Sequence, residues 1–217
     1  MNFLDILAEL AKGAGYTVLV TLVCAITGFL VGLGIAGLRR MGCGRINTLL
    51  DTYTYVFRGV PLLVLLFLVY FGLPGIGLKV SPLLAMVLSL GLISGAYLAE
   101  VFRGALNLVE GSEILAAQAM GMSKIQILTL LEFPQMLRFA LPGIVNEFTT
   151  VLKYSPFAYT VGIPEITKQA MTLSATTMRG LEIYLAVGLL YFFIYRLFLL
   201  GVQLVERQLR IPGIVPP

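Results

Sequence analysis

Long apolar stretches separated by short polar segments run through this sequence. A helix needs about 20 mainly apolar residues to cross the hydrocarbon core of a bilayer. Residues 13–38 contain no charged side chain, and four later stretches are mainly apolar over a similar length. The pattern predicts an all-α integral membrane protein in which residues 1–217 form a single domain. The predicted spans are about 15–38, 50–73, 82–106, 138–162 and 183–206.

The first of these spans is rich in glycine. Gly28 and Gly32 form a G-x-x-x-G pair, which allows two membrane helices to approach closely. Glycine is also tolerated in membrane helices without such a role, so the pair alone leaves both interpretations open.

The second predicted span contains helix breakers beside a charge. Arg58 stands just before Gly59 and Pro61, and the proline ring frees a backbone carbonyl one turn earlier. Unwound backbone at membrane depth is tolerated where it is buried in protein or lines a cavity. Arg58 could therefore hold an anionic group there. The structural alternative is an ion pair with Glu100 or Glu147.

The fourth predicted span carries two charges of opposite sign. Glu147 and Lys153 are six positions apart, about 240° around a helix, so they do not pair on one straight helix. Asn146 shares a stripe with Lys153, and Tyr154 lies on the stripe of Glu147. This wide polar face could line a cavity that recognises a zwitterion. The alternative pairs Glu147 with Arg58, and Lys153 with a dimer partner.

Another pair of charges lies at the inner end of the third span. Glu100 and Arg103 are spaced i, i+3, which places them on one helical face. We interpret them as a structural ion pair near the membrane interface.

The distribution of basic residues predicts the orientation of the chain. If the loop at 39–48, the connection at 107–137 and the C-terminus share one side, that side and its flanks hold eight Lys and Arg, against four opposite. Basic loops stay in the cytoplasm. The count predicts an N-terminus outside, a C-terminus inside, and a cytoplasmic 107–137 segment.

Composition removes several classes of function. The chain is 59% hydrophobic and 12% charged, whereas soluble proteins are nearer 45–50% and about 25%. It contains no His, so Ser-His and Cys-His catalysis and His-based metal sites are excluded. Cys24 and Cys43 suggest neither a disulfide framework nor a metal cluster. We therefore expect no catalytic residue, no metal and no enzyme activity.

The chain also lacks the usual marks of ATP or nucleic-acid binding. There is no G-x-x-x-x-G-K-[ST] motif, so any ATP-driven work must use another subunit. The net charge of +4 comes from scattered residues, which does not predict binding to nucleic acid.

The 107–137 segment is amphipathic and too charged to span a membrane. Ser112 is expected to cap a short helix that Gly121 interrupts. Ser123 is expected to cap a second helix, which Pro134 ends. Two short helices around a glycine turn make a compact knob that can dock into a groove on a partner. The alternative is a helix lying on the membrane surface.

Several motifs resemble the permease subunits of ABC importers for polar amino acids. The A-A-x-x-x-G at 116–121, with F-P-Q at 133–135, looks like the EAA coupling motif of ABC importer permeases. The R-G-V-P-L-L-V at 58–64 and A-Y-L-A-E-V-F-R-G at 96–104 are similar to R-G-T-P-L-L-V and A-Y-x-A-E-x-x-R-x-G of the polar-amino-acid family. The N-E-F and L-K at 146–153 continue the pattern, and the resemblance covers about residues 13–210.

The resemblance implies a type I ABC importer with a methionine-permease-like core. One chain would be half of a transmembrane homodimer or heterodimer, in the cytoplasmic membrane of a prokaryote. The coupling segment would dock into a separate dimer of ABC ATPases, which binds ATP and Mg. A periplasmic or extracellular solute-binding protein would deliver the amino acid. The residues implied in ATPase coupling are Glu113, Leu115, Ala116, Ala117, Met120, Gly121 and Met122.

Two positions depart from the family pattern. Leu115 stands where the EAA motif has its Glu, and Tyr154 follows Lys153 where many relatives have an acidic residue. An acidic residue beside a cavity would favour a cationic ligand. With Tyr154 we expect a neutral polar or aromatic amino acid.

Other functions compete with this interpretation. The chain could be an ABC permease for another small solute, such as methionine, or a membrane scaffold. A secondary carrier that needs no ATPase usually has more helices or repeated halves, and we see no repeat here. An intramembrane Ser-Lys enzyme is disfavoured, because Ser155 and Lys153 do not share a helical face.

Overall fold

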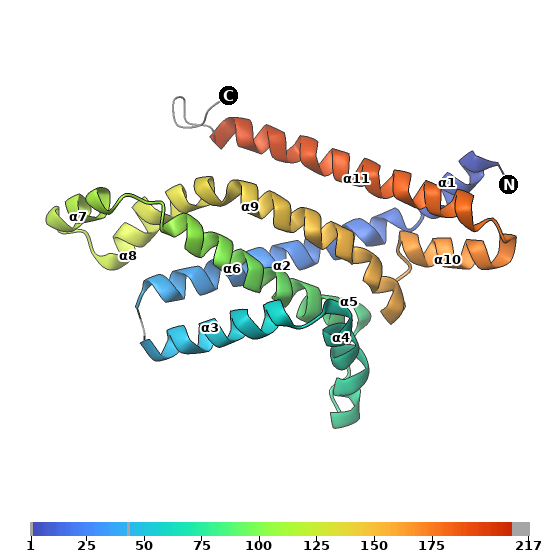
Figure 1. The fold of residues 1–217 in the computed structure, drawn as a ribbon, viewed down its shortest axis with the longest axis horizontal. Coiled ribbons are helices and arrows are strands. Elements are labelled where there is room, and N and C mark those ends of the chain that lie inside the picture. The colour runs from blue at the N-terminus through green and yellow to red at the C-terminus, as the bar shows by residue number, and fades with distance from the viewer. Residues whose placement is uncertain (1, 43, 210–217) are drawn as a thin grey trace. The chain divides into compact units, whose positions relative to one another are not determined.

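The computed structural model describes residues 2–42 and 44–209, with side chains described as far as residue 202. Cys43 therefore lies outside the described side chains, as do Arg207 and Arg210, which are two of the eight basic residues counted for the orientation. The described residues form helices and no strand, as the apolar pattern predicts (Figure 1). The α-helices are α1 (Phe3–Ala11), α2 (Ala14–Arg40), α3 (Gly44–Gly59), α4 (Leu62–Phe67), α5 (Pro82–Met86), α6 (Leu92–Leu106), α7 (Gly111–Ala119), α8 (Lys124–Gln126), α9 (Phe133–Tyr154), α10 (Ile166–Thr177) and α11 (Gly180–Leu209). Short π- and 3-10 helices join them at η1 (Leu68–Gly72), η2 (Leu73–Ile76), η3 (Val87–Gly91), η4 (Ile127–Glu132) and η5 (Ser155–Val161).

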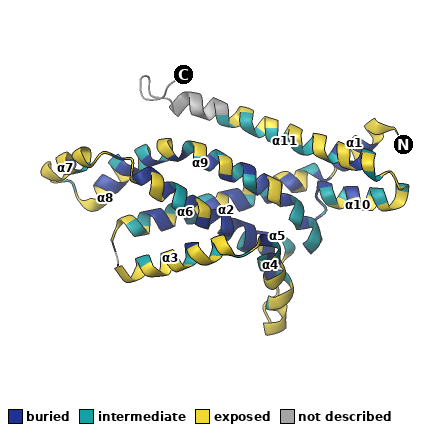
Figure 2. Cartoon of the chain, in the orientation of Figure 1, coloured by how far each residue is buried: buried dark blue, intermediate teal, exposed yellow. Residues whose placement is uncertain are grey.

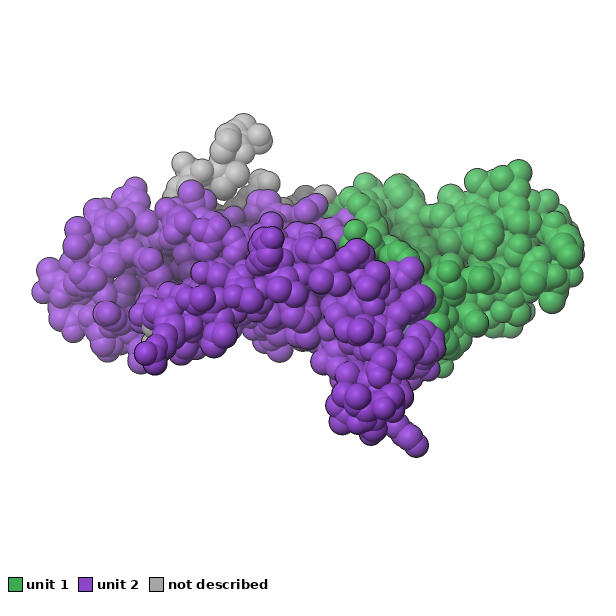
Figure 3. Space-filling view, turned by 60° about the horizontal axis from the view of Figure 1, so that its bottom comes forward, with its two compact units in different colours: residues 1–22, 152–217 green, residues 23–151 purple. Residues whose placement is uncertain are grey.

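These helices group into two compact units, shown in different colours in Figure 3. One unit comprises residues 1–22 and 152–217, and the other comprises residues 23–151. Each unit has its own cluster of buried apolar side chains.

In the unit of residues 23–151, α2 packs closely against α6 through glycine. A Cβ atom on Gly32 would lie 2.8 Å from Leu98 Cβ and 3.0 Å from the backbone nitrogen of Ala99. A Cβ atom on Gly28 would meet Ser94 in the same way. Both glycines of the G-x-x-x-G pair therefore face α6, and the close-packing interpretation is confirmed.

The core of this unit lies where α2, α6 and α9 meet. Phe102 and Met136 are completely buried, and the ring of Phe29 stands edge-on to that of Phe102. Figure 2 shows buried positions along all three helices. Close packing of such large side chains fixes the three helices against one another.

The second predicted span is not one straight helix. The chain bends by 104° between α3 and the segment Leu62–Ile76. Pro61 has no N–H to donate and lies in extended conformation directly before α4. The bend therefore follows from the helix breakers that the sequence places beside Arg58.

Three helical segments of the described chain are long and apolar enough to cross a membrane: α2, Pro82–Leu106 and Gly180–Val202. The bent pair Gly44–Gly59 and Leu62–Ile76 makes a fourth if it counts as one span. The predicted fourth span, α9, does not qualify, because it mixes charged and polar residues with apolar ones. The count of five spans thus stays a prediction.

The 107–137 segment forms the two expected short helices, with a different cap on the first. Glu110, and not Ser112, is the N-cap of α7, and the Ser112 hydroxyl donates to the Glu110 carboxylate at 3.2 Å. Gly121 has a φ of +82°, a conformation that glycine adopts at no steric cost. Ser123 caps α8 reciprocally with Gln126.

The expectation that Pro134 ends the second helix is wrong. The helix continues through η4 into α9, of which Pro134 is the second residue. The π-helix η4 shifts the hydrogen bonding just before the proline, so its missing N–H is tolerated as in a first turn.

In the other unit, α1, α10 and α11 bury a small apolar cluster. Ile6 and Leu10 of α1 pack against Ala170 of α10 and Ile183 and Ala186 of α11. Beyond this cluster α11 is largely unburied: only 6% of its most apolar stretch is buried within the chain. That surface is suited to lipid or to another subunit.

The packing of α2 against α6 gives a stability test. Gly32→Ala forces the backbone of α6 away, and we expect a loss of about 1–3 kcal/mol in the free energy of unfolding. In detergent the apparent Tm should fall by about 2–4 °C for each kcal/mol lost. Gly34→Ala is the control, because a Cβ there meets nothing within 4 Å. Equal melting temperatures for the two variants would contradict the close approach.

Candidate functional site

Arg58 lies at the last turn of α3, exposed beside the bend. Its guanidinium stands 5.2 Å from the centre of the Tyr97 ring, a cation–π contact between α3 and α6. The Tyr97 hydroxyl in turn donates to the Arg58 carbonyl oxygen at 3.5 Å. Gly59 and Pro61 are also exposed. In the described part of the chain no ion pair joins Arg58 to Glu100 or Glu147, so the structural alternative for Arg58 is not observed.

The polar residues of α9 do not all share one environment. Asn146, Lys153 and Tyr154 are exposed, in keeping with a polar face. Glu147 is only 8% exposed and lies near the buried hydroxyl of Ser94 on α6. Glu147 therefore points into the unit of residues 23–151, away from the exposed stripe.

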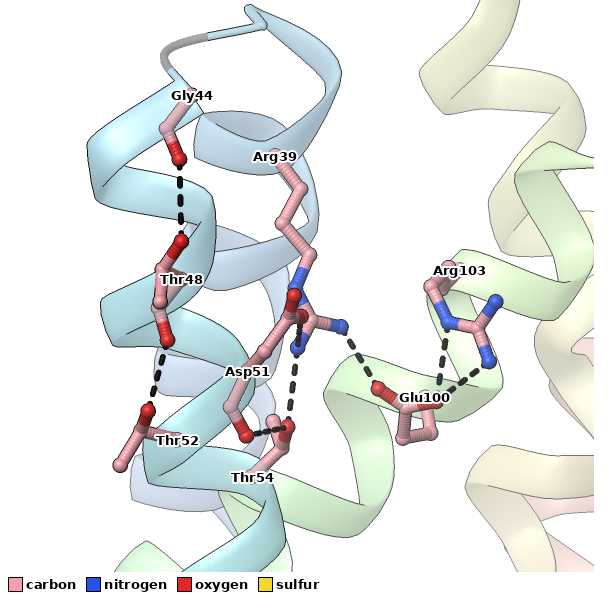
Figure 4. Close-up of polar contacts among 8 residues, drawn as sticks. All are labelled: Arg39, Gly44, Thr48, Asp51, Thr52, Thr54, Glu100 and Arg103. Atoms are coloured by element: carbon pink, nitrogen blue, oxygen red, sulfur yellow. Dashed lines mark hydrogen bonds and ion pairs between the residues drawn. The ribbon is translucent and has the colours of Figure 1, made fainter.

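Glu100 belongs to an ion-pair network that joins the C-terminal end of α2 to the middle of α3 and of α6 (Figure 4). The predicted pair with Arg103 is present, with 2.7 Å between Arg103 Nη2 and Glu100 Oε2. Arg39 Nη1 donates to the other carboxylate oxygen at 2.7 Å. Arg39 Nη2 also reaches Asp51 Oδ1 at 2.7 Å and donates to Thr54 Oγ1 at 3.0 Å.

Sequence reasoning missed Arg39 and Asp51 as members of this network. One signal was present: Arg39 ends the first apolar stretch and Asp51 begins the second, on either side of one short loop. Two charges held that close by a short loop are natural partners.

The next residue of α2 makes a separate ion pair. Arg40 Nε donates to Glu132 Oε1 at 2.8 Å, and its Nη2 contacts the same oxygen. Glu132 is 3% exposed and ends η4, directly before α9. Further along, Gln135 Nε2 donates to Glu113 Oε2 of α7 at 2.5 Å. Sequence reasoning found neither contact.

The predicted coupling residues present an apolar surface. Leu115 is 67% exposed and Met120 is 82% exposed, while Ala117 is buried and anchors α7. The remaining coupling residues are Glu113, Ala116 and Gly121, all exposed, and Met122, half-buried. Leu115 thus presents apolar area at the position where the EAA motif has its Glu, and Met120 adds to the exposed apolar surface.

A buried carboxylate in the other unit was also missed. Glu165 is fully buried and caps α10, accepting hydrogen bonds from the backbone nitrogens of Thr167 and Lys168 at 2.7 and 2.8 Å. The Tyr191 hydroxyl of α11 donates to it at 2.8 Å. A Cβ atom on Gly13 would lie 2.6 Å from the Glu165 carbonyl carbon. Burial raises the pKa of the Glu165 carboxyl, although its hydrogen bonds oppose the shift.

No group of His, Cys, Asp and Glu in the described residues has the arrangement of a metal site. The described residues instead offer an exposed arginine at a bent helix, a charged network that joins the end of α2 to α3 and α6, and exposed apolar side chains on the 107–137 segment.

The chain belongs to the family described as binding-protein-dependent transport system inner membrane component, which matches residues 15–211. It is 32% identical over 197 residues to the probable amino-acid ABC transporter permease protein YckA of Bacillus subtilis (strain 168), covering 91% of this chain and 87% of that protein. It is 31% identical over 192 residues to the histidine/lysine/arginine/ornithine transport system permease protein HisQ of Escherichia coli (strain K12), covering 83% and 84%.

Solved structures agree on the fold. A chain in the crystal structure of an amino acid ABC transporter with histidines has a TM-score of 0.84 at 31% identity, covering 96% of this chain and 99% of that one. A chain of the MetNI methionine ABC transporter in an inward-facing conformation has a TM-score of 0.79 at 20% identity, covering 95% and 99%. The predicted all-α, type I ABC importer fold is therefore confirmed.

The buried Glu165 predicts a pH-dependent stability. A carboxyl whose pKa is higher in the folded chain stabilises the fold below its ordinary value of 4.5, and this contribution is lost as pH rises through the folded value. The Tm of the wild type should therefore fall as the pH rises above about 4.5. Glu165→Gln should flatten that slope, whereas Glu9→Gln, at an exposed site, should leave it unchanged. A wild-type slope retained in Glu165→Gln would contradict this assignment.

Proposed function

We propose that this chain is the transmembrane subunit of an ATP-driven importer of polar amino acids. The exposed coupling segment carries the proposal, because Leu115 on α7 and Met120 at its C-cap are covered by nothing among the residues that the structure describes. An apolar surface beside a membrane domain needs a partner. The names of the relatives, amino-acid ABC permeases, supply the class of solute.

The proposed assembly has three kinds of partner. A dimer of ABC ATPases binds the coupling segment and holds ATP and Mg, so this chain needs no cofactor of its own. A second permease subunit completes the pathway, as a homodimer or a heterodimer. A solute-binding protein delivers the amino acid from outside, and lipid surrounds the assembly in the cytoplasmic membrane. The proposed orientation keeps the N-terminus outside and the C-terminus inside.

Arg58 is the proposed contact for the substrate carboxylate. It is exposed at a bend within an otherwise apolar region, and its partner is an aromatic ring rather than a carboxylate. A guanidinium held in place by Tyr97 retains N–H groups for a planar anion. Gly59 and Pro61 keep the backbone open beside it. Asn146, Glu147, Lys153 and Tyr154 remain proposed residues of the pathway, with Tyr154 favouring a neutral polar or aromatic ligand.

Reconstitution tests the proposal. Proteoliposomes containing this chain with its ATPase and binding protein should accumulate a radiolabelled polar amino acid only when ATP is present. Uptake of methionine in preference to polar amino acids would replace the proposed substrate class. Uptake by this chain alone, driven by an ion gradient, would overturn the ATP-driven mechanism.

The coupling surface predicts a specific loss of ATPase binding. Leu115→Asp places a charge where the structure exposes apolar area, and the cost of desolvating that charge should weaken ATPase binding by about tenfold or more. Gln118→Asp adds the same charge to the same helix at a position that is already polar, and should change binding little. Co-purification in detergent, titrated with ATPase, measures both. Equal binding by the two variants would place the interface elsewhere.

The carboxylate contact predicts a change in ligand discrimination. In the purified permease–ATPase complex without binding protein, the wild type should bind an amino acid about tenfold or more tightly than its amide. Arg58→Gln should lose that preference, and Arg58→Lys should keep part of it. Equilibrium binding of the labelled amino acid and its amide reads this out directly. Unchanged discrimination in Arg58→Gln would exclude Arg58 from carboxylate recognition.

A further inference from the structure

Two consecutive arginines at the end of α2 contact different parts of the unit of residues 23–151. Arg39 binds Glu100 of α6 and Asp51 of α3. Arg40 binds Glu132, at the end of η4. Because the two residues are adjacent in one helix, a displacement of the end of α2 moves both sets of contacts together.

The Arg40 contact leads to the coupling segment. Glu132 is buried, with its carboxylate directed to Arg40, and it directly precedes α9. In the first turn of α9, Gln135 donates to Glu113 of α7. A hydrogen bond thus joins α7 to the start of α9, and an ion pair joins the residue before α9 to the end of α2.

The Arg39 contact leads toward Arg58. Arg39 binds Glu100, which lies three residues beyond Tyr97 on α6. Tyr97 supports the guanidinium of Arg58 on α3. The same Arg39 guanidinium also holds α3 directly through Asp51. Both helices that position Arg58 are therefore bound to the end of α2.

We infer that Arg39 and Arg40 form a junction that transmits movement of the coupling segment to the helices holding Arg58. This inference rests on the proposed ATP-driven import. Charges held in a medium of low dielectric keep their partners, because an unpaired charge there is costly. When an ATPase displaces α7, the displacement reaches the start of α9 through the Gln135–Glu113 hydrogen bond. The Arg40–Glu132 ion pair then passes it to the end of α2. The ion pairs of Arg39 with Asp51 and Glu100 then move α3 and α6 in the same direction. In this role the two arginines are positioning residues that touch no substrate.

The test compares uptake with ATP hydrolysis in the same proteoliposomes. Arg40→Gln and Glu132→Gln each break the Arg40–Glu132 pair. Each variant should retain ATP hydrolysis, while amino acid transported per ATP falls about fivefold or more. The reversed pair, Arg40→Glu with Glu132→Arg, should recover most of the lost coupling. The matched control is Lys12→Gln, which breaks the exposed Glu9–Lys12 pair and should leave uptake per ATP unchanged.

Three outcomes separate this inference from its alternatives. Uptake and hydrolysis falling in proportion, with no recovery in the reversed pair, would show that the ion pair only holds the fold. Unchanged uptake per ATP in Arg40→Gln would overturn the junction outright. If the buried-charge variants fail to fold, Gln135→Met removes the contact to Glu113 without stranding a charge, and normal coupling there overturns the inference. Absence of ATP-driven uptake in the wild type would instead refute the proposed function.

Discussion

The structure depends on how charges at the ends of apolar helices are compensated. A charged side chain near a membrane interior is expensive unless it is paired. At the end of α2, Arg39 forms ion pairs with both Asp51 and Glu100, and Arg40 forms an ion pair with Glu132. Each pair crosses from one helix to another, so satisfying the charges also sets the positions of α3, α6 and the start of α9. The glycine-mediated packing of α2 on α6 continues this arrangement along the helices.

Two exposed surfaces with proposed functions lie on elements that these ion pairs connect. The bend after α3 leaves Arg58 exposed, supported by Tyr97. The turn at Gly121 leaves Leu115 and Met120 exposed on the coupling segment. The ion pairs at the end of α2 connect the elements that carry the two surfaces.

The sequence predicts much of this fold, because apolar length and helix breakers are local properties. The helical class, the bend near Pro61 and the glycine turn at Gly121 follow from short segments read alone. The Glu100–Arg103 pair follows from helical spacing. The Arg40–Glu132 pair and the Tyr191–Glu165 hydrogen bond do not, because their members lie 92 and 26 positions apart and depend on which helix faces which. The prediction that Pro134 ends a helix was wrong, because the π-helix η4 before it shifts the hydrogen bonding so that no N–H is needed at that position.

The central claim is that the 107–137 segment binds an ATPase which drives the membrane domain. Its most direct test is purification from native membranes in mild detergent, with every co-purifying chain identified and its stoichiometry measured. The account predicts a stoichiometric partner carrying a P-loop, bound through α7 and α8. A chain that purifies alone and still moves solute in liposomes would contradict it.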